Sequence, residues 1–157
     1  MKPSVYLETT IPSYYAARPS RDVVIAGHQA TTRDWWDNRL SHFRAFISQI
    51  VLDEAAAGDS QAAKDRLVVL RPFPSLDIRD DAIDLARDFV ESGPLPRRAA
   101  RDALHIALAA VHGIDFLVTW NCTHIANAEM TAKFTEICRD HGLECPRICT
   151  PEELMGT

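Results

Sequence analysis

The feature that most constrains the fold is an uncharged apolar segment in the C-terminal half of the chain. Residues 103–113 read Ala-Leu-His-Ile-Ala-Leu-Ala-Ala-Val-His-Gly and contain no Asp, Glu, Lys or Arg. We expect a helix over residues 99–112 that ends at Gly113. Because apolar side chains fall on most of its faces, such a helix must be largely buried. The rest of the chain therefore has to supply a core around it.

Short strand-like segments alternate with helical ones along the chain. The expected strands are residues 5–7, 43–47, 116–119 and 147–149, and residues 70–76, which contain Pro72 and Pro74, form a loop or an edge strand. The other expected helices cover residues 11–17, the second half of 23–40, 49–57, 60–69, 80–91 and 126–141, with Thr10, Ser48 and Ser60 as N-caps.

This alternation predicts a parallel sheet with helices on both faces. The fold class is therefore α/β, a three-layer α/β/α arrangement around a mostly parallel central sheet. The sequence shows no internal repeat, linker or low-complexity tract, so we expect one domain over residues 1–157. A chain of this length can bury a sizeable core without disulfides or a structural metal.

Charge and hydropathy exclude two classes of protein. With 17 basic and 22 acidic residues the net charge is −5, which excludes a strongly basic nucleic-acid coat but not a local basic patch. The uncharged run of residues 116–128 is too short and too polar to span a membrane. The apolar start of the chain is broken by Glu8, so no secretory leader is expected and the cytoplasm is the expected location.

The four cysteines allow a zinc reading that we do not favour. Four possible zinc ligands lie close together in the sequence, separated by two, three and three residues: Cys138, His141, Cys145 and Cys149. Structural zinc sites usually contain close cysteine pairs, and the only such pair here brackets a proline in a strand-like run. Reduced thiols packed in the core are the simpler interpretation.

Acidic and polar residues follow three of the predicted strands. Glu8 follows residues 5–7, Ser48 follows the second strand with Glu54 six residues later, and Thr119-Trp120-Asn121 closes the third. The carboxyl ends of parallel strands meet at one rim of the sheet, where ligands bind. Glu8 and Glu54 taken singly could equally be solvated residues.

Asp102 is the most unusual carboxylate, because it stands in the first turn of the apolar helix. A carboxylate next to buried material needs a partner, a cap or a metal ion. A favourable interaction with the helix dipole, or a pair with Arg98 or Arg101, would also account for it.

If Glu8, Glu54 and Asp102 converge, they repel one another, and such a cluster requires protonation or a cation. Ligands that are all oxygen favour Mg²⁺ or Mn²⁺ over zinc. A divalent cation held by a few carboxylates suits phosphodiester hydrolysis, because it activates water and neutralises the developing phosphate charge.

Four segments together resemble the motifs of the PIN-domain family, in the same order. They are Tyr6-Leu7-Glu8-Thr9-Thr10, Ser48-x5-Glu54, Asp102-Ala-Leu-His-Ile-Ala-Leu-Ala109 and Leu117-Val-Thr-Trp-Asn121. The toxin-type, VapC-like branch is the most similar, and the resemblance runs from Lys2 to Leu154. The resemblance implies a Mg²⁺- or Mn²⁺-dependent endoribonuclease, the toxin of a type II toxin–antitoxin pair, often a homodimer and blocked by an antitoxin protein.

Matching positions assign roles to individual residues. The resemblance makes Glu8, Glu54, Asp102 and Asn121 the catalytic, metal-binding set, and makes Thr9, Ser48 and Thr119 hydrogen-bonding residues behind it. Two positions depart from the commoner pattern, because the first acid is Glu8 in place of Asp and the fourth position is the neutral Asn121. Loss of one negative charge weakens any proposal of two metals.

Contacts to RNA are less defined by the sequence. Arg97, Arg98 and Arg101 precede or open the helix of Asp102 and could meet phosphate, or they could be ordinary surface charges. His105 and His112 are expected as core residues rather than bases, while His124 could approach the rim.

Two other functions remain open. The first is a binding module that keeps the fold and binds RNA or a protein without cleaving it. The second is a phosphoacceptor domain, which is disfavoured because Glu8 stands alone after the first strand and the only late lysine, Lys133, lies in a predicted helix.

Overall fold

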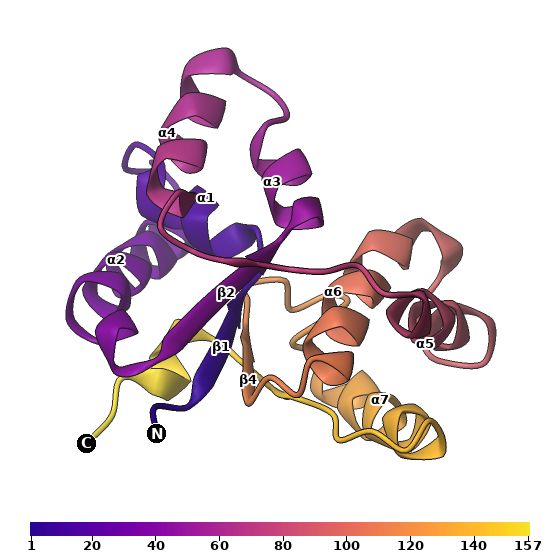
Figure 1. Ribbon diagram of the computed structural model, residues 1–157. Helices are drawn as coiled ribbons and strands as arrows, with labels where there is room; N and C mark the ends of the chain where they lie inside the picture. Colours follow the sequence, from indigo (N-terminus) through magenta and orange to yellow (C-terminus); the bar gives the residue numbers. More distant parts are fainter.

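The computed structural model describes residues 1–157 and contains one five-stranded sheet in which every pairing is parallel (Figure 1). The strand order is β3-β2-β1-β4-β5. The α/β class and the parallel sheet are therefore confirmed, and β1 occupies the centre. The strands are β1 (Ser4–Leu7), β2 (Arg44–Ser48), β3 (Ser75–Leu76), β4 (Phe116–Val118) and β5 (Arg147–Cys149).

Seven α-helices flank the sheet on both sides. In Figure 1, α5, α6 and α7 lie on one side of the strands, and α1, α2 and α4 lie on the other. The helices are α1 (Thr10–Ala16), α2 (Val23–Asn38), α3 (Gln49–Ala55), α4 (Ser60–Leu70), α5 (Asp80–Glu91), α6 (Ala100–Val111) and α7 (Ala128–Asp140). Single 3₁₀ turns cover Leu40–His42, Arg97–Ala99 and Pro151–Leu154.

Helix α6 is buried, as its uncharged sequence requires. Ala103 and every residue from His105 to Ala110 are buried, and all four residues of β1 are buried as well. Apart from the polar residues Ser4 and His105, they belong to one apolar core of 33 buried residues. A helix that is apolar on most faces can pack against the sheet and against α5 at once, and this double packing fixes the position of its first turn.

The order in which strands are added to the sheet reverses at its central strand, β1. After β1 the chain adds β2 and β3 on one side, and it then crosses to add β4 and β5 on the other. Leu7 pairs with Val118, and the Glu8 amide donates to the Val118 carbonyl at 3.1 Å. The first residues beyond β1 and β4 are thus neighbours at the switch point, where open α/β sheets form their binding crevice.

Helix boundaries differ from the sequence expectation where a cap was misassigned. Helix α2 is helical from its start, because the Asp22 carboxylate accepts from the Ile25 amide at 3.0 Å. Asp59, and not Ser60, caps α4. Thr10 is the first residue of α1 rather than its cap. Ser48 caps α3 as predicted, accepting from the Val51 amide.

The zinc reading is not supported. No three of Cys138, His141, Cys145 and Cys149 bring ligand atoms within metal-binding distance of one another. The four cysteines are free thiols, and His141 Nε2 pairs with the Asp88 carboxylate at 2.6 Å. Burial raises the pKa of the Cys149 thiol to about 12, which keeps it protonated.

No helix is both long and apolar enough to cross a membrane.

A reciprocal hydrogen-bond pair joins the starts of β1 and β4. Asp115 Oδ2 accepts from the amide of Ser4 at 2.7 Å and from its hydroxyl at 3.0 Å, while Ser4 Oγ accepts from the Asp115 amide at 2.9 Å. The backbone and hydroxyl hydrogen bonds from Ser4 lower the pKa of Asp115. The pair pins the central strands together at the end opposite Glu8.

We expect Asp115→Ala to lower the free energy of unfolding by about 1–2 kcal/mol at pH 7, because it leaves the buried Ser4 amide without a partner. Since the folded pKa lies below the unfolded value of about 3.9, this stabilisation is complete above that value and is lost as the pH falls through the folded pKa. Urea unfolding at pH 7 and at pH 3 measures the difference, which should shrink at the lower pH. The exposed Asp84→Ala serves as the control, and equal losses in both variants would contradict the expectation.

Candidate functional site

Glu8 is a buried carboxylate at the end of the central strand. Its side chain is almost enclosed, with the residue 4% exposed. Oε1 accepts three hydrogen bonds, from the Thr10 amide at 3.1 Å, the Thr10 hydroxyl at 2.5 Å and the Thr119 hydroxyl at 2.6 Å. Oε2 accepts no hydrogen bond and is not enclosed by the protein, so it is open to solvent. Glu8 therefore presents one free oxygen.

Both threonines are themselves fixed by backbone amides. Thr10 Oγ1 accepts from the Trp120 amide at 2.8 Å, and Thr119 Oγ1 accepts from the Asn121 amide at 2.9 Å. Each hydroxyl thus has a donor behind it and must give its own proton to Glu8. The segments that follow β1 and β4 are locked together through this carboxylate.

Glu54, which lies on α3, also has one carboxylate oxygen held by hydrogen bonds and one oxygen without a partner. Its Oε1 accepts from the Thr9 hydroxyl at 2.7 Å and from His105 Nε2 at 2.6 Å, while Oε2 has no hydrogen-bond partner. Burial alone would raise the pKa of Glu54, but the hydrogen bonds from His105 and Thr9 and the charge of Arg101 together lower it. Glu54 is held as a carboxylate with one oxygen free.

The two carboxylates and His105 meet at one point. One ligand atom from each of Glu8, Glu54 and His105 lies within 4.8 Å of the other two. Two unit negative charges at this separation repel by about 3.5 kcal/mol at an effective dielectric near 20. The site therefore favours a positive charge between the carboxylates.

His105 connects this point to a buried chain of hydrogen bonds. Its Nδ1 lies 2.6 Å from the Tyr6 hydroxyl, which lies 2.7 Å from Ser48 Oγ. His105, Tyr6 and Ser48 are fully buried. Burial raises the pKa of Tyr6 above its ordinary value, so the phenol keeps its proton.

Asp102 lies at the start of α6 but outside the group formed by Glu8, Glu54 and His105. Its Oδ2 pairs with His124 Nδ1 at 3.0 Å, and both side chains are about one-fifth exposed. Asn121 takes no part in a carboxylate contact. Its Oδ1 accepts from the His124 amide at 3.0 Å, so it braces the turn that carries His124.

The residues assigned to the rear of the site behave differently from one another. Thr9 and Thr119 donate directly to Glu54 and Glu8. Ser48 reaches Glu54 only through Tyr6 and His105. Thr119 therefore contacts a site carboxylate directly, whereas Ser48 does not.

The three arginines near α6 are exposed and differ in surroundings. Arg101 lies near enough to Glu54 for its charge to lower the pKa of that carboxyl. Arg97 lines a shallow groove of about 350 Å³ between α5 and α6, whose apolar walls include Ile83 and Leu104. Arg98 forms no ion pair.

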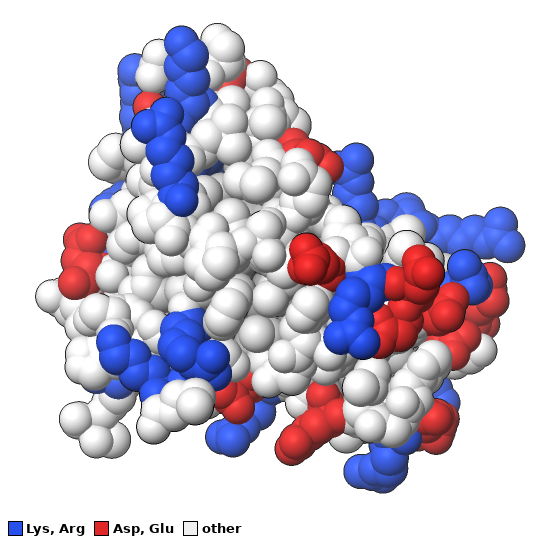
Figure 2. Space-filling model, in the orientation of Figure 1, with Lys and Arg blue, Asp and Glu red and all other residues white.

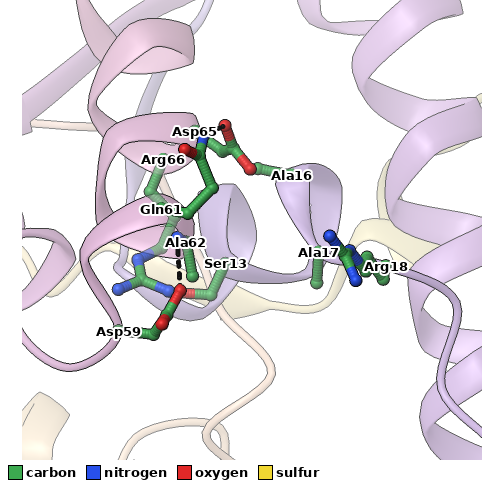
Figure 3. Close-up of a pocket in the computed structure, with 9 residues that line it drawn as sticks. All are labelled: Ser13, Ala16, Ala17, Arg18, Asp59, Gln61, Ala62, Asp65 and Arg66. Carbon is green, nitrogen blue, oxygen red and sulfur yellow. Dashed lines mark hydrogen bonds between the residues drawn. The ribbon is translucent and has the colours of Figure 1, made fainter.

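A second cavity, of about 480 Å³, opens between α1 and α4 (Figure 3). Its lining includes two basic residues, Arg18 and Arg66, and two acidic ones, Asp59 and Asp65. Arg66 is already committed, because it donates to the carbonyls of residues 55 and 57 and braces the turn between α3 and α4. The cavity contains none of the site carboxylates.

The face seen in Figure 2 has no continuous basic surface. Uncharged atoms occupy its centre, and acidic and basic side chains are interspersed where α5 lies in Figure 1. This distribution agrees with the net charge of −5. Recognition of a polyanion would depend on local arginines.

Sequence reasoning missed three members of the site, Tyr6, Thr10 and His105, while it considered that His124 could approach the rim. Two signals were available. His105 follows Asp102 by three residues and so shares its helix face. A tyrosine within a buried strand needs a partner for its hydroxyl. Neither signal identifies the partner, which depends on how α6 and β2 pack against β1.

The free atoms fit a hard divalent cation. Both nitrogens of His105 are already hydrogen-bonded, so the atoms available at this point are Oε2 of Glu8 and Oε2 of Glu54. Carboxylate oxygens are the ligands that Mg²⁺ and Mn²⁺ prefer, and Mg²⁺ usually retains several waters.

Comparison with known proteins identifies a family. A family model described as PIN domain matches residues 22–121, about two-thirds of the chain. The matched range includes Glu54, Asp102 and Asn121, and it excludes Glu8, whose place in the site rests on geometry. No curated protein matches the chain.

We expect Glu8→Gln to raise the free energy of unfolding of the metal-free protein by about 1–3 kcal/mol, because it removes the repulsion from Glu54 while its amide oxygen still accepts the three hydrogen bonds. Thermal or urea unfolding in chelator measures this change. Mn²⁺ should stabilise the native protein and not the variant.

Asp53→Asn provides the matched control, since Asp53 neighbours Glu54 in sequence but is exposed and accepts from Gln49 at 2.8 Å. Its stability in chelator should stay within about 0.5 kcal/mol of the native value. A Glu8→Gln protein less stable than the native one in chelator would contradict the repulsion argument.

Proposed function

Because the chain belongs to the PIN domain family, we propose that it is a Mg²⁺- or Mn²⁺-dependent endoribonuclease that hydrolyses RNA phosphodiester bonds. PIN domains are generally nucleases. The observation that carries the proposal is the pair of close carboxylates, Glu8 and Glu54, each with one oxygen fixed by the protein and one oxygen free.

The chain's own residues would divide the work. Glu8 and Glu54 would hold the cation through their free oxygens, with Asp102 as a third acidic group at the start of α6. When bound, the cation would lower the pKa of a bound water and neutralise charge that develops on the phosphate. Thr10, Thr119 and Thr9 would keep the carboxylates oriented.

Asn121 and His124 would act at the edge of the site. Asn121 braces the turn through the His124 amide, and His124 holds Asp102 through Nδ1. Direct coordination by Asn121 would use the second lone pair of an Oδ1 that already accepts from that amide. Arg97, Arg98 and Arg101 would contact RNA phosphates, with Arg101 nearest to Glu54 in its electrostatic effect.

The biological role belongs to the same proposal. We propose a toxin of a type II toxin–antitoxin pair that acts in the cytoplasm as a homodimer and is blocked by an antitoxin protein. The support is the resemblance of the four sequence motifs to VapC-like proteins. One domain over residues 1–157 is proposed as the active unit.

A binding module that does not cleave RNA is the second candidate. The observation that favours it is Asn121, which is neutral and whose side-chain oxygen is already engaged by the His124 amide. The acidic set then consists of three carboxylates, two of which are paired with a histidine, Glu54 with His105 and Asp102 with His124.

We expect purified protein to cleave a mixed RNA pool with Mn²⁺ or Mg²⁺ and not with chelator, and we expect Asp102→Asn to reduce the rate by about 100-fold or more. The exposed Asp53→Asn should cleave at the native rate. Undiminished cleavage by Asp102→Asn would show that the assigned site is wrong. Absence of cleavage by folded, partner-free protein with either metal would support the binding module.

We expect Arg101→Ala to weaken binding of a non-cleavable 2′-O-methyl RNA and to reduce the dependence of binding on salt, because a lost phosphate contact reduces the slope of log K against log salt by about 0.7. Arg97→Ala and Arg98→Ala test the other two positions by fluorescence anisotropy across a salt series. Arg139→Ala, on the exposed face of α7, is the control. Identical slopes in all four variants would remove these arginines from the RNA interface.

A further inference from the structure

One buried chain of hydrogen bonds runs from the cap of α3 to the site carboxylate. It links the Val51 amide to Ser48 Oγ at 3.4 Å, Ser48 to Tyr6 at 2.7 Å, Tyr6 to His105 Nδ1 at 2.6 Å, and His105 Nε2 to Glu54 at 2.6 Å. Ser48, Tyr6 and His105 have no other side-chain partners. The direction of every proton in the chain can therefore be assigned.

The assignment starts from Glu54. Its carboxylate only accepts, so His105 Nε2 must carry the proton. In the neutral imidazole Nδ1 then accepts from the Tyr6 hydroxyl. The Tyr6 oxygen accepts from the Ser48 hydroxyl, whose oxygen accepts from the Val51 amide. Every donor and acceptor in the chain is satisfied.

The opposite direction leaves a buried group unsatisfied. If His105 Nδ1 carried a proton, Tyr6 would have to donate to Ser48, and the Ser48 hydroxyl hydrogen would have no acceptor. Ser48 is fully buried, so no solvent could replace that acceptor. An unpaired buried hydroxyl is costly. The surroundings thus select one tautomer of His105.

Resting on the proposed metal site, we propose that His105 is a positioning residue and not a metal ligand, and that the Ser48–Tyr6–His105 chain fixes Oε1 of Glu54 so that Oε2 alone faces the cation. A ring nitrogen of His105 lies close enough to the two carboxylates to ligate a metal with them. Ligation through Nε2 would break its bond to Glu54 and would invert the whole chain.

Two substitutions at His105 separate these roles. His105→Gln keeps a donor near the position of Nε2 and loses the contact to Tyr6, whereas His105→Asn keeps a group near Nδ1 and loses the donor to Glu54. A positioning role predicts that Mn²⁺ affinity, measured by calorimetry, falls about tenfold or more in His105→Asn and clearly less in His105→Gln. Equal losses in the two variants would overturn the proposal.

Tyr6→Phe tests the chain without changing a residue near the cation. It removes the hydroxyl that selects the tautomer, and we expect Mn²⁺ affinity to fall several-fold. His112→Gln is the matched control, because His112 lies at the other end of α6 and contacts only the carbonyl of Asp77 at 2.8 Å. Its Mn²⁺ affinity should equal the native value.

Two measurements on the native protein cover the case in which a variant does not fold. ¹⁵N NMR of the metal-free protein should show His105 protonated at Nε2 and not at Nδ1. Pulsed EPR of the Mn²⁺-loaded protein should show no directly coordinated ¹⁴N. The other tautomer, or a coordinated nitrogen, would overturn the positioning role and leave the nuclease proposal standing. Failure of the native protein to bind Mn²⁺ would overturn both.

Discussion

A carboxylate buried at the end of the central strand is the constraint on which the rest of the site depends. Glu8 is nearly enclosed, and a buried charge is stable only when its hydrogen-bonding capacity is met. The three donors to its Oε1 come from the start of α1 and from the residue after β4. Satisfying one oxygen thus joins the two segments that leave the sheet at its switch point. The other oxygen is left to a ligand.

The same logic makes Glu54 part of the core and part of the surface at once. Its Oε1 is tied to His105 inside α6, the most completely buried helix, while its side chain remains about one-quarter exposed. Nothing in the hydrogen-bonding pattern removes the repulsion between Glu54 and Glu8. The protein therefore holds two like charges close together through its fold, as expected for a site whose stability is completed by a cation.

Sequence patterns predicted the parts of this arrangement that depend on one element at a time. The uncharged segment gave α6, the strand-like runs gave the parallel sheet, and the residues after those runs placed Glu8 and Thr119 at one rim. Ser48 was identified as a cap from its position alone. The cap of α4 was missed because two adjacent residues, Asp59 and Ser60, both favour a cap position, and backbone geometry decides between them.

Contacts that cross between elements could not be predicted, because they depend on the exact register of one packed surface on another. His105 reads as an ordinary core residue until α6 is placed against β1 and α3, when its two nitrogens find Tyr6 and Glu54. Asn121 shows the converse: read as a weakened ligand, it braces the turn that carries His124. Its carbonyl oxygen accepts from the His124 amide as a carboxylate oxygen would, and it does so without adding a negative charge beside the Asp102–His124 pair.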